Sequence, residues 1–191
     1  MKYLVIALAA IIIGGLVLTS CRDEPKKSSE SAAQKPQKRV ATNALMERLY
    51  ANFHADPVTQ AQKDENALID YAVDKGLDVK KTASGLYYIV HKEGTGPTYI
   101  HGQPCKAHYT GYNLEGKIFD SSHKRNKPLA FNVGQMIAGW NEALKLLNPG
   151  SKAQLLIPSH LAYGARGAGG DIPPHTPLVF DVELLPMASI K

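Results

Sequence analysis

The sequence predicts an α+β fold, in which a curved antiparallel β-sheet of five to six strands is wrapped on one short helix. Three observations carry this prediction. From residue 86 onward, the chain breaks into short runs of β-branched and aromatic residues separated by turn-forming clusters. Only one segment of that region, residues 138–147, has the pattern of a helix. Two amphipathic segments precede the strands and predict an N-terminal helical hairpin.

Length and charge limit the classes of function. With 191 residues, the chain is long enough for one sizeable domain with appendages. The net charge of +5 gathers near the N-terminus, because residues 21–39 hold six basic and three acidic residues. Nucleic-acid binding needs a clustered basic face that neutralises several phosphates, and the rest of the chain is close to neutral. We therefore expect no nucleic-acid partner.

Residues 1–20 have the layout of a secretory signal peptide. Lys2 is followed by an apolar run over residues 3–18, and small residues close the run before Cys21. Leu18-Thr19-Ser20-Cys21 resembles the lipobox of bacterial lipoproteins, in which the cysteine is acylated and becomes the mature N-terminus. An uncleaved signal anchor is the alternative, since the run approaches the ~18 residues that begin to span a bilayer.

The lipobox resemblance implies a lipid-anchored protein of the bacterial cell envelope. We expect Cys21 to carry the lipid and the outer membrane to hold the anchor, on its periplasmic side or at the cell surface. Residues 21–40 are expected to form a flexible tether, because Lys, Ser, Gln and Pro dominate them and residues 25–39 contain no large apolar side chain. The tether would hold the folded domain away from the membrane.

Residues 41–83 are predicted to form a helical extension. Leu45, Leu49 and Phe53 recur at helical spacing, which predicts a first helix over residues 42–53. One side of this helix is apolar and must be buried.

The second helix of the extension is framed by local signals at both ends. Asp56 and Pro57 predict its N-cap and first turn, and Gly76 predicts its C-terminal end. The apolar sides of the two helices can pack on each other and on the domain. The alternative is a homodimer through these helices, and the sequence leaves both arrangements open.

The region 84–191 contains six segments with the pattern of β-strands. They are residues 86–90, 106–114, 117–120, 129–133, 152–158 and 178–185. Glu115-Gly116 predicts a hairpin turn, and Asn148-Pro149-Gly150 closes the predicted helix at 138–147. Cys105 opens a strand and is expected to be a buried, small apolar residue.

Six short blocks in this region resemble FKBP-type peptidyl-prolyl cis-trans isomerases. They are His108-Tyr109-Thr110-Gly111, Phe119-Asp120-Ser121-Ser122, Gly139-Trp140, Ala162-Tyr163-Gly164, Ile172-Pro173-Pro174 and the segment 179–185. The resemblance implies an FKBP-like isomerase domain over residues 84–191, in the form of a bacterial lipoprotein. It implies partners that are X-Pro segments of unfolded or exported proteins, and neither a cofactor nor a metal ion.

The same resemblance assigns residues to a substrate pocket. The implied catalytic residues are Tyr109, Phe119, Asp120, Trp140, Tyr163 and Phe180. The implied substrate-binding residues are Arg125, Leu129, Phe131, Met136, Ile137 and Ile172. In this family, Trp140 would form the pocket floor and Asp120 would lie near the twisting carbonyl. Arg125 would pair with Asp120 or with the Tyr109 hydroxyl, and the Tyr163 hydroxyl would bond a substrate carbonyl.

These residue types suit a reaction that breaks no bond. Rotation about a peptide bond is opposed by a barrier of ~18–20 kcal/mol, because resonance gives the C–N bond partial double-bond character. Resonance is lost in the twisted amide, so a dry apolar pocket favours it over the polar planar form. No nucleophile, base or metal cluster stands at the spacing that its chemistry requires.

The pocket residues leave a second function open. A chaperone or binding lipoprotein could use the same groove to hold clients with little turnover. Leu129 and Met136 depart from the family's usual residues, which puts sequence preference and inhibitor affinity in doubt. The glycine-rich segment 164–170 leads into Ile172-Pro173-Pro174 rather than a helix, so a phosphate-binding loop is not expected.

Overall fold

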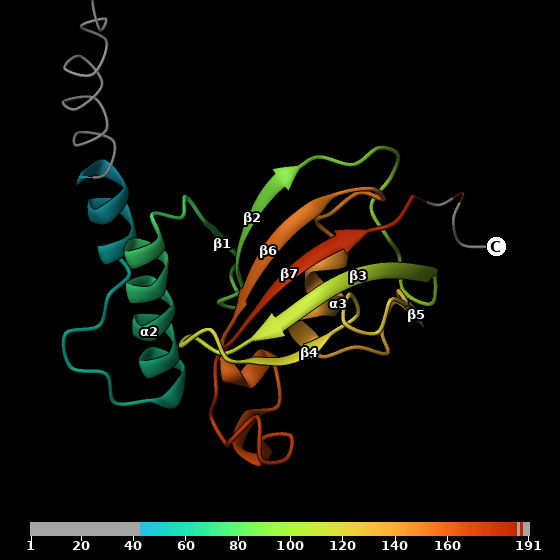
Figure 1. The fold of residues 1–191 in the computed structure, drawn as a ribbon. Helices are drawn as coiled ribbons and strands as arrows, with labels where there is room; N and C mark the ends of the chain where they lie inside the picture. The colour runs from blue at the N-terminus through green and yellow to red at the C-terminus, as the bar shows by residue number, and fades with distance from the viewer. Residues whose placement is uncertain (1–42, 187, 189–191) are drawn as a thin grey trace, which may run out of the picture.

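A computed structural model of the chain describes residues 43–186 and residue 188. Figure 1 shows a curved sheet that crosses over a short helix, with the N-terminal helices at one end. The strands are β1 (Lys80–Lys81), β2 (Tyr87–Lys92), β3 (Pro104–Tyr112), β4 (Ile118–Ser121), β5 (Leu129–Asn132), β6 (Lys152–Ile157) and β7 (Leu178–Leu184). The helices are the segment 43–50, α2 (Gln60–Lys75), α3 (Ala138–Leu144) and the 3-10 turns η1 (Ser159–Leu161) and η2 (Gly164–Arg166).

The predicted signal peptide, lipidated Cys21 and tether lie outside the described residues. Among the helices that the structure describes, none has the length and hydrophobicity needed to cross a membrane.

The sheet is antiparallel throughout and has the strand order β1-β2-β6-β7-β3-β4. Strand β3 pairs with β5 along its first half and with β4 along its second half, while β7 covers its other edge. The predicted α+β fold with a curved antiparallel sheet is confirmed. The sheet has seven strands rather than five to six, because the two-residue strand β1 is too short to leave a pattern in the sequence.

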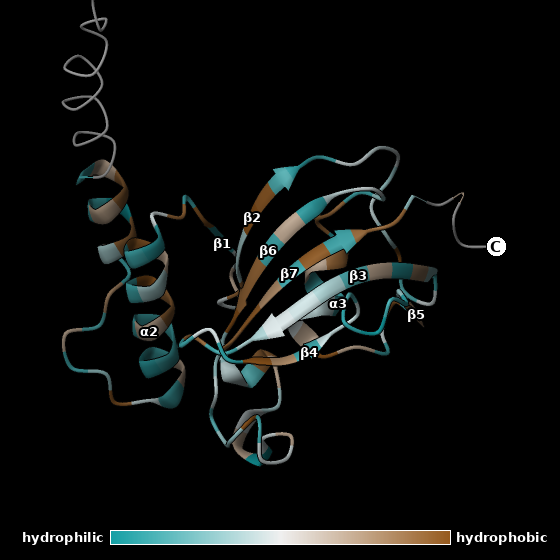
Figure 2. Cartoon of the chain, viewed as in Figure 1, coloured by the Kyte–Doolittle hydropathy of each residue, from teal (hydrophilic) through white to brown (hydrophobic). Residues whose placement is uncertain are grey.

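Both faces of the sheet are buried over its central strands. Successive strand residues point to opposite faces, so Leu155 and Phe180 enter one core while their neighbours Leu156 and Val179 enter another. Figure 2 shows hydrophobic residues along β2, β6 and β7, and hydrophilic ones on the outer side of α2. Because both faces are buried, consecutive residues of these strands are apolar, and the strands appear in the sequence as nearly continuous apolar runs.

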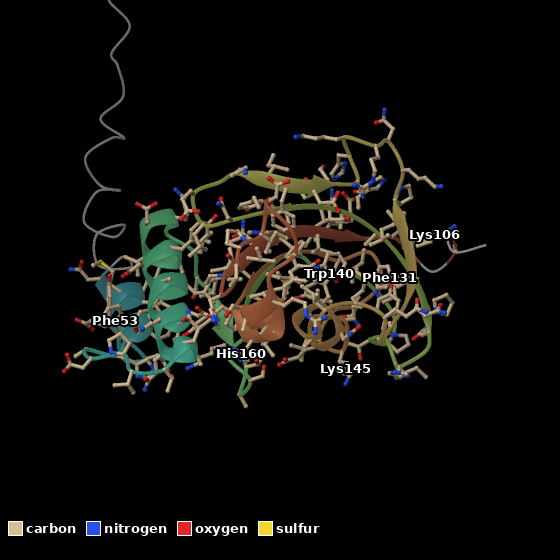
Figure 3. All side chains as sticks on the ribbon, turned by 90° about the horizontal axis from the view of Figure 1, so that it is seen from below. Phe53, Lys106, Phe131, Trp140, Lys145 and His160 are labelled. Carbon is tan, nitrogen blue, oxygen red and sulfur yellow. The ribbon has the colours of Figure 1, made fainter. Side chains whose placement is uncertain are left out.

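The larger core lies between the sheet and α3. Figure 3 shows Trp140 of α3 beneath the sheet, beside Phe131 of β5. Helix α3 approaches β6 closely at Gly139, where an added Cβ would lie 2.6 Å from the Ile157 side chain. The glycine therefore brings Trp140 against the concave face. The helix ends at Leu144, three residues before the predicted end, because turns of the 3-10 type follow it.

The smaller core joins the N-terminal helices to the outer face of the sheet. Leu68, Ile69 and Ala72 of α2 are fully buried, in a cluster with Tyr87 of β2 and Leu156 of β6. The helices thus pack on the domain, the first of the two arrangements that the sequence allows; a homodimer stays a prediction.

The prediction that Asp56 caps the second helix is wrong. Thr59 is the N-cap of α2: its hydroxyl accepts the Gln62 amide hydrogen, and the Gln62 side chain accepts the Thr59 amide hydrogen, which forms a capping box. This reciprocal pair satisfies two backbone N–H groups, so the helix begins at Gln60. Gly76 does end the helix as predicted, with a left-handed φ of 63°.

Candidate functional site

A pocket of about 250 Å³ opens at the concave side of the sheet, next to the start of α3. Each wall comes from a different element: β3, β4, the segment before α3, α3 itself, the β6–β7 connection and β7. The lining residues are Tyr109, Phe119, Asp120, Gln135, Met136, Ile137, Trp140, Tyr163 and Phe180. All six predicted catalytic residues are therefore brought together in one concavity.

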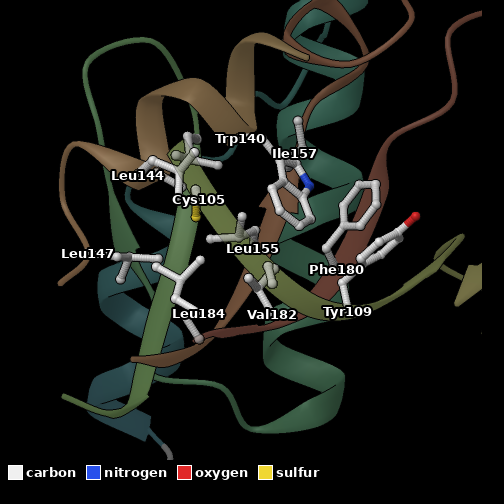
Figure 4. Packing of buried hydrophobic residues seen from close by; sticks show 14 of the residues in the cluster. Cys105, Tyr109, Trp140, Leu144, Leu147, Leu155, Ile157, Phe180, Val182 and Leu184 are labelled. Atoms are coloured by element: carbon white, nitrogen blue, oxygen red, sulfur yellow. The ribbon is translucent and has the colours of Figure 1, made fainter. Parts of the chain in front are cut away.

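In the deep part of the pocket, the Trp140 ring stands nearly at right angles to the rings of Tyr109 and Phe180 (Figure 4). The Trp140 ring centroid lies 5.5 Å from those of Tyr109 and Phe180, with interplanar angles of 85° and 89°. Phe119 stands edge-on to Phe180 at 5.6 Å. Trp140 is 1% exposed. Edge-to-face contacts hold the rings at fixed angles, so the apolar concavity is preformed.

Gly111 allows two of these rings to approach the strand. It lies two residues after Tyr109 on β3 and therefore faces the same side. A Cβ at this position would come within 2.7 Å of the rings of Phe119 and Phe180. The missing side chain at Gly111 thus creates the space in which the Phe119 and Phe180 rings meet.

One wall of the pocket is polar. The Tyr109 hydroxyl donates a hydrogen bond to Asp120, and Arg125 donates to the same carboxylate. Arg125 also donates to the Tyr109 hydroxyl, over 3.1 Å, so the three side chains close a triangle. The predicted pairing of Arg125 with Asp120 or with Tyr109 is present in both forms.

The triangle holds Asp120 in its charged form. Burial alone would raise the pKa of the Asp120 carboxyl, but hydrogen bonds from Tyr109 and Arg125 outweigh it, and the pKa lies below its ordinary value. Burial, followed by the hydrogen bond to Asp120, raises the pKa of the Tyr109 hydroxyl. At neutral pH the wall therefore presents a carboxylate and a neutral phenol.

A tight turn after β4 places Arg125. Asn126 has a φ of 49°, in the left-handed region that asparagine tolerates better than most residues. The turn closes through a hydrogen bond from the Lys127 amide to the Ser122 carbonyl, over 3.2 Å. The Ser122 hydroxyl accepts the Tyr109 amide hydrogen over 2.8 Å, which ties the turn to β3.

The segment that carries Met136 and Ile137 is fastened by Asn141 of α3. The Asn141 side chain accepts a hydrogen bond from the Gly134 amide, over 2.8 Å, and donates one to the Met136 carbonyl. These bonds tie two backbone groups of the segment just before α3 to a side chain of the helix.

Four predicted substrate-binding residues do not line the pocket. Arg125 acts on it through Asp120 and Tyr109, as described above. Phe131 packs against Trp140, with ring centroids 5.8 Å apart, and Leu129 packs against the larger core. Ile172 is 5% exposed and belongs to the same core. The roles assigned to all these residues stay predictions.

The structure adds Gln135 and Asn141 to the site. Gln135 lines the pocket, and its side chain accepts the Asn132 amide hydrogen over 2.9 Å. Neither residue belongs to an aromatic block, and their positions depend on the path of the chain between β5 and α3. Asn141 offered one signal, an amide side chain in the first turn of a predicted helix, where such residues bond to the backbone.

The arrangement suits binding and torsion of a polypeptide rather than bond cleavage. The lining residues include no Ser, Thr, Cys, Lys or His that could serve as a nucleophile. Over residues 43–186, no group of three or more His, Cys, Asp or Glu side chains could hold a metal ion. Cys105 is buried at 1% exposure, and burial raises the pKa of its thiol to about 11, so it is not a reactive thiolate.

Comparisons with known proteins agree with this geometry. The family model described as FKBP-type peptidyl-prolyl cis-trans isomerase matches residues 97–185. A probable FKBP-type peptidyl-prolyl cis-trans isomerase of Haemophilus influenzae is 43% identical over 131 residues, which are 69% of this chain and 54% of the relative. An FK506-binding protein of Neisseria meningitidis is 49% identical over 96 residues, which are 49% of this chain and 88% of the relative.

Solved structures show the same likeness. The crystal structure of FkpA from Escherichia coli matches with a TM-score of 0.59 at 36% sequence identity, covering 84% of this chain and 73% of FkpA. The chain spans about half the length of the first curated relatives that it matches.

Proposed function

This chain belongs to the FKBP-type peptidyl-prolyl cis-trans isomerase family, and we propose that it accelerates the cis-trans isomerisation of X-Pro bonds in exported proteins as they fold. Uncatalysed isomerisation takes tens to hundreds of seconds, long enough to limit folding. The single observation that carries the proposal is the preformed pocket of edge-to-face rings around Trp140, bordered by an ionised Asp120.

The pocket would act by favouring the twisted amide. A proline ring seated on Trp140, between Tyr109 and Phe180, removes the imide from water. The planar imide is the more polar form and loses more by leaving water, so its twisted form is favoured in relative terms. The Asp120 carboxylate stands on the one polar wall, where it would repel the carbonyl oxygen of the planar form and favour its rotation.

Refolding of a proline-limited protein and isomerisation of a Phe-Pro peptide test this activity. We expect the unsubstituted chain to accelerate both, and Asp120→Val to lower kcat/KM on the order of tenfold or more. Asp74→Val is a matched control, because Asp74 is an exposed carboxylate paired with Lys75 on α2, away from the pocket. A chain that accelerates neither reaction would defeat the proposal.

We also propose that Cys21 is lipidated, so that the domain works at the membrane of a bacterial cell envelope. The lipobox-like residues before Cys21 support this, with the outer membrane as the expected site, on either side. More than one acyl chain gives far stronger anchoring than one. Cys21→Ser is expected to move the protein from the membrane fraction to the soluble periplasmic fraction, and unchanged fractionation would contradict lipidation.

A second candidate function is a chaperone or binding lipoprotein with little turnover. It is favoured by large apolar side chains that stay exposed near the N-terminal helices: Met46, Tyr50, Phe53 and Val58. These side chains could hold unfolded clients, and they could equally form the predicted homodimer interface. Suppressed aggregation of a proline-free client by Asp120→Val would support holding, and sedimentation of a monomer at all concentrations would exclude the homodimer.

A further inference from the structure

Helix α2 contacts the connection that carries Tyr163, although α2 lies outside the region that the family model matches. The connection runs from the end of β6 to the start of β7 and contains η1 and η2. In Figure 1 it is the orange-red segment beside the lower half of α2. Figure 3 places His160 of η1 between the N-terminal helices and Trp140. The two regions are therefore linked in space next to the pocket.

The link is a buried hydrogen bond. The Ser159 amide donates to the Asp64 carboxylate over 2.7 Å, and the two residues are 95 positions apart in the chain. Both are 2% exposed. Asp64 receives a second hydrogen bond from Gln60, also over 2.7 Å. A buried carboxylate is costly unless hydrogen-bonded, so this pair is a strong constraint on the position of Ser159.

Asp64 supplies a cap that the connection lacks. Pro158 precedes η1 and makes no side-chain capping bond, so the first amide of η1 has no local acceptor. The Asp64 carboxylate takes that place from another element.

Tyr163 lies four residues after Ser159, the residue that Asp64 holds. The Ala162 amide donates to the Ser159 carbonyl over 2.9 Å, which completes η1 one residue before Tyr163. On the other side of Tyr163, the Gly164 carbonyl accepts the His175 amide hydrogen over 2.9 Å. Tyr163 is thus held between two fastened points, of which only the first reaches α2. Its own side chain lines the pocket and is 40% exposed.

We propose that Asp64 is a positioning residue of the isomerase, which sets the place of Tyr163 at the pocket rim through the Ser159 amide. The inference rests on the proposed function of the pocket and adds to it a role for the helical extension. The helical extension then contributes to the substrate pocket and is more than a spacer, because the second turn of α2 holds the chain segment that forms one wall of the pocket.

The test compares three variants of the full chain. Asp64→Leu keeps the number and branching of the side-chain heavy atoms but removes both acceptors. Asp64→Asn keeps one acceptor for the Ser159 amide, and the Gln60 amide can rotate to accept from the new NH₂ group. Glu65→Gln is the matched control, because Glu65 bonds Tyr87 and His54 and so anchors α2 without touching the connection.

The readouts separate positioning from general stability. We expect Asp64→Leu to lower kcat/KM for a Phe-Pro peptide about tenfold, mainly through a higher KM, because the wall that contacts substrate is displaced. Amide hydrogen exchange over residues 159–163 should accelerate in the same variant. Asp64→Asn should restore both values, and Glu65→Gln should change neither. In a Tyr163→Ala background, Asp64→Leu should have no further effect on KM.

Three results would overturn the inference: unchanged exchange and KM in Asp64→Leu, an equal effect of Glu65→Gln, or a full effect in the Tyr163→Ala background. If Asp64→Leu does not fold, Ser159→Pro removes the donor instead; the ψ of 153° at Pro158 suits a residue before proline. If the unsubstituted chain is inactive, the proposed function fails, and the exchange rates over residues 159–163 still decide whether Asp64 positions the connection.

Discussion

Gly111 shows how one residue without a side chain sets the geometry of a pocket. Gly111 has no positive φ, so its backbone conformation does not require glycine, although the register between β3 and β4 shifts between Gly111 and Tyr112. The constraint comes from space, since the rings of Phe119 and Phe180 occupy the volume that a Cβ would fill. The activity of the pocket should therefore depend on this position, although Gly111 itself brings no side chain to it.

We predict that Gly111→Ala lowers kcat/KM for an X-Pro peptide on the order of tenfold, because the two rings must move apart. The same crowding should cost ~1–3 kcal/mol of unfolding free energy. Peptide kinetics and urea denaturation measure the two effects. Gly170→Ala is the control, since nothing lies within 4 Å of its added Cβ. Full activity of Gly111→Ala would show that the rings have room to adjust.

The charge of Asp120 predicts how stability depends on pH. Because the pKa of its carboxyl in the folded chain lies below the unfolded value, its ion pair with Arg125 contributes stability above that unfolded value. The contribution is lost as the pH falls through the folded pKa. We expect the stability difference between the unsubstituted chain and Asp120→Asn to be constant above about pH 5 and to vanish in more acidic solution. Denaturation midpoints measured across this range check the sign; a difference that grows on acidification would contradict it.

At the scale of elements, α2 is anchored by apolar and polar contacts on adjacent faces. Leu68, Ile69 and Ala72 pack on the outer face of the sheet, while Asp64 reaches η1. Burial alone would raise the pKa of the Glu65 carboxyl. Hydrogen bonds from Lys81, Tyr87 and His54 outweigh the effect of burial, so the pKa of Glu65 is lowered. The apolar contacts of α2 are with the sheet, and the Asp64 contact is with η1. Substitutions in the two sets can therefore separate effects on stability from effects on pocket geometry.

Leu68→Ala is expected to lower the unfolding free energy by ~2–5 kcal/mol, because the side chain is fully buried and leaves a cavity. Its kcat/KM should stay close to that of the unsubstituted chain, because Leu68 lies in the smaller core, on the face of the sheet opposite the pocket. Chemical denaturation and peptide kinetics measure the two quantities, with the exposed Lys63→Ala as control. A loss of activity as large as the loss of stability would mean that the two cores are not separable.

For the whole molecule, the extension is part of the folded structure, and removing it should expose the outer face of the sheet. Tyr87, Leu156 and Val179 are each at most 1% exposed beneath it. A chain that begins at residue 76 should lose on the order of 5 kcal/mol of stability, since burying each large apolar side chain contributes ~1.5–3 kcal/mol. Thermal denaturation and binding of a hydrophobic dye test this. An unchanged melting temperature would show that the extension contributes nothing to the fold.

The sequence by itself determined the fold class, the pocket's aromatic set and the end of α2 at Gly76. The fold class and the end of α2 follow from local quantities, namely the period of apolar residues and the conformational freedom of a glycine. The aromatic set came from the resemblance of short sequence blocks to a known family. Leu155 and Leu156 illustrate the limit, because both are apolar and their sequence does not say that they enter different cores.

Only the tertiary structure decided the short strand β1, the pocket position of Gln135 and the bond between Asp64 and Ser159. Each depends on where distant segments meet. The residues next to Asp64 in the sequence do not indicate that it bonds a residue 95 positions away. Thr59 rather than Asp56 is the N-cap of α2, because Gln62 stands at the position that completes a capping box with Thr59. Contacts across the chain are selected by the packing of the whole fold, which no single stretch of residues contains.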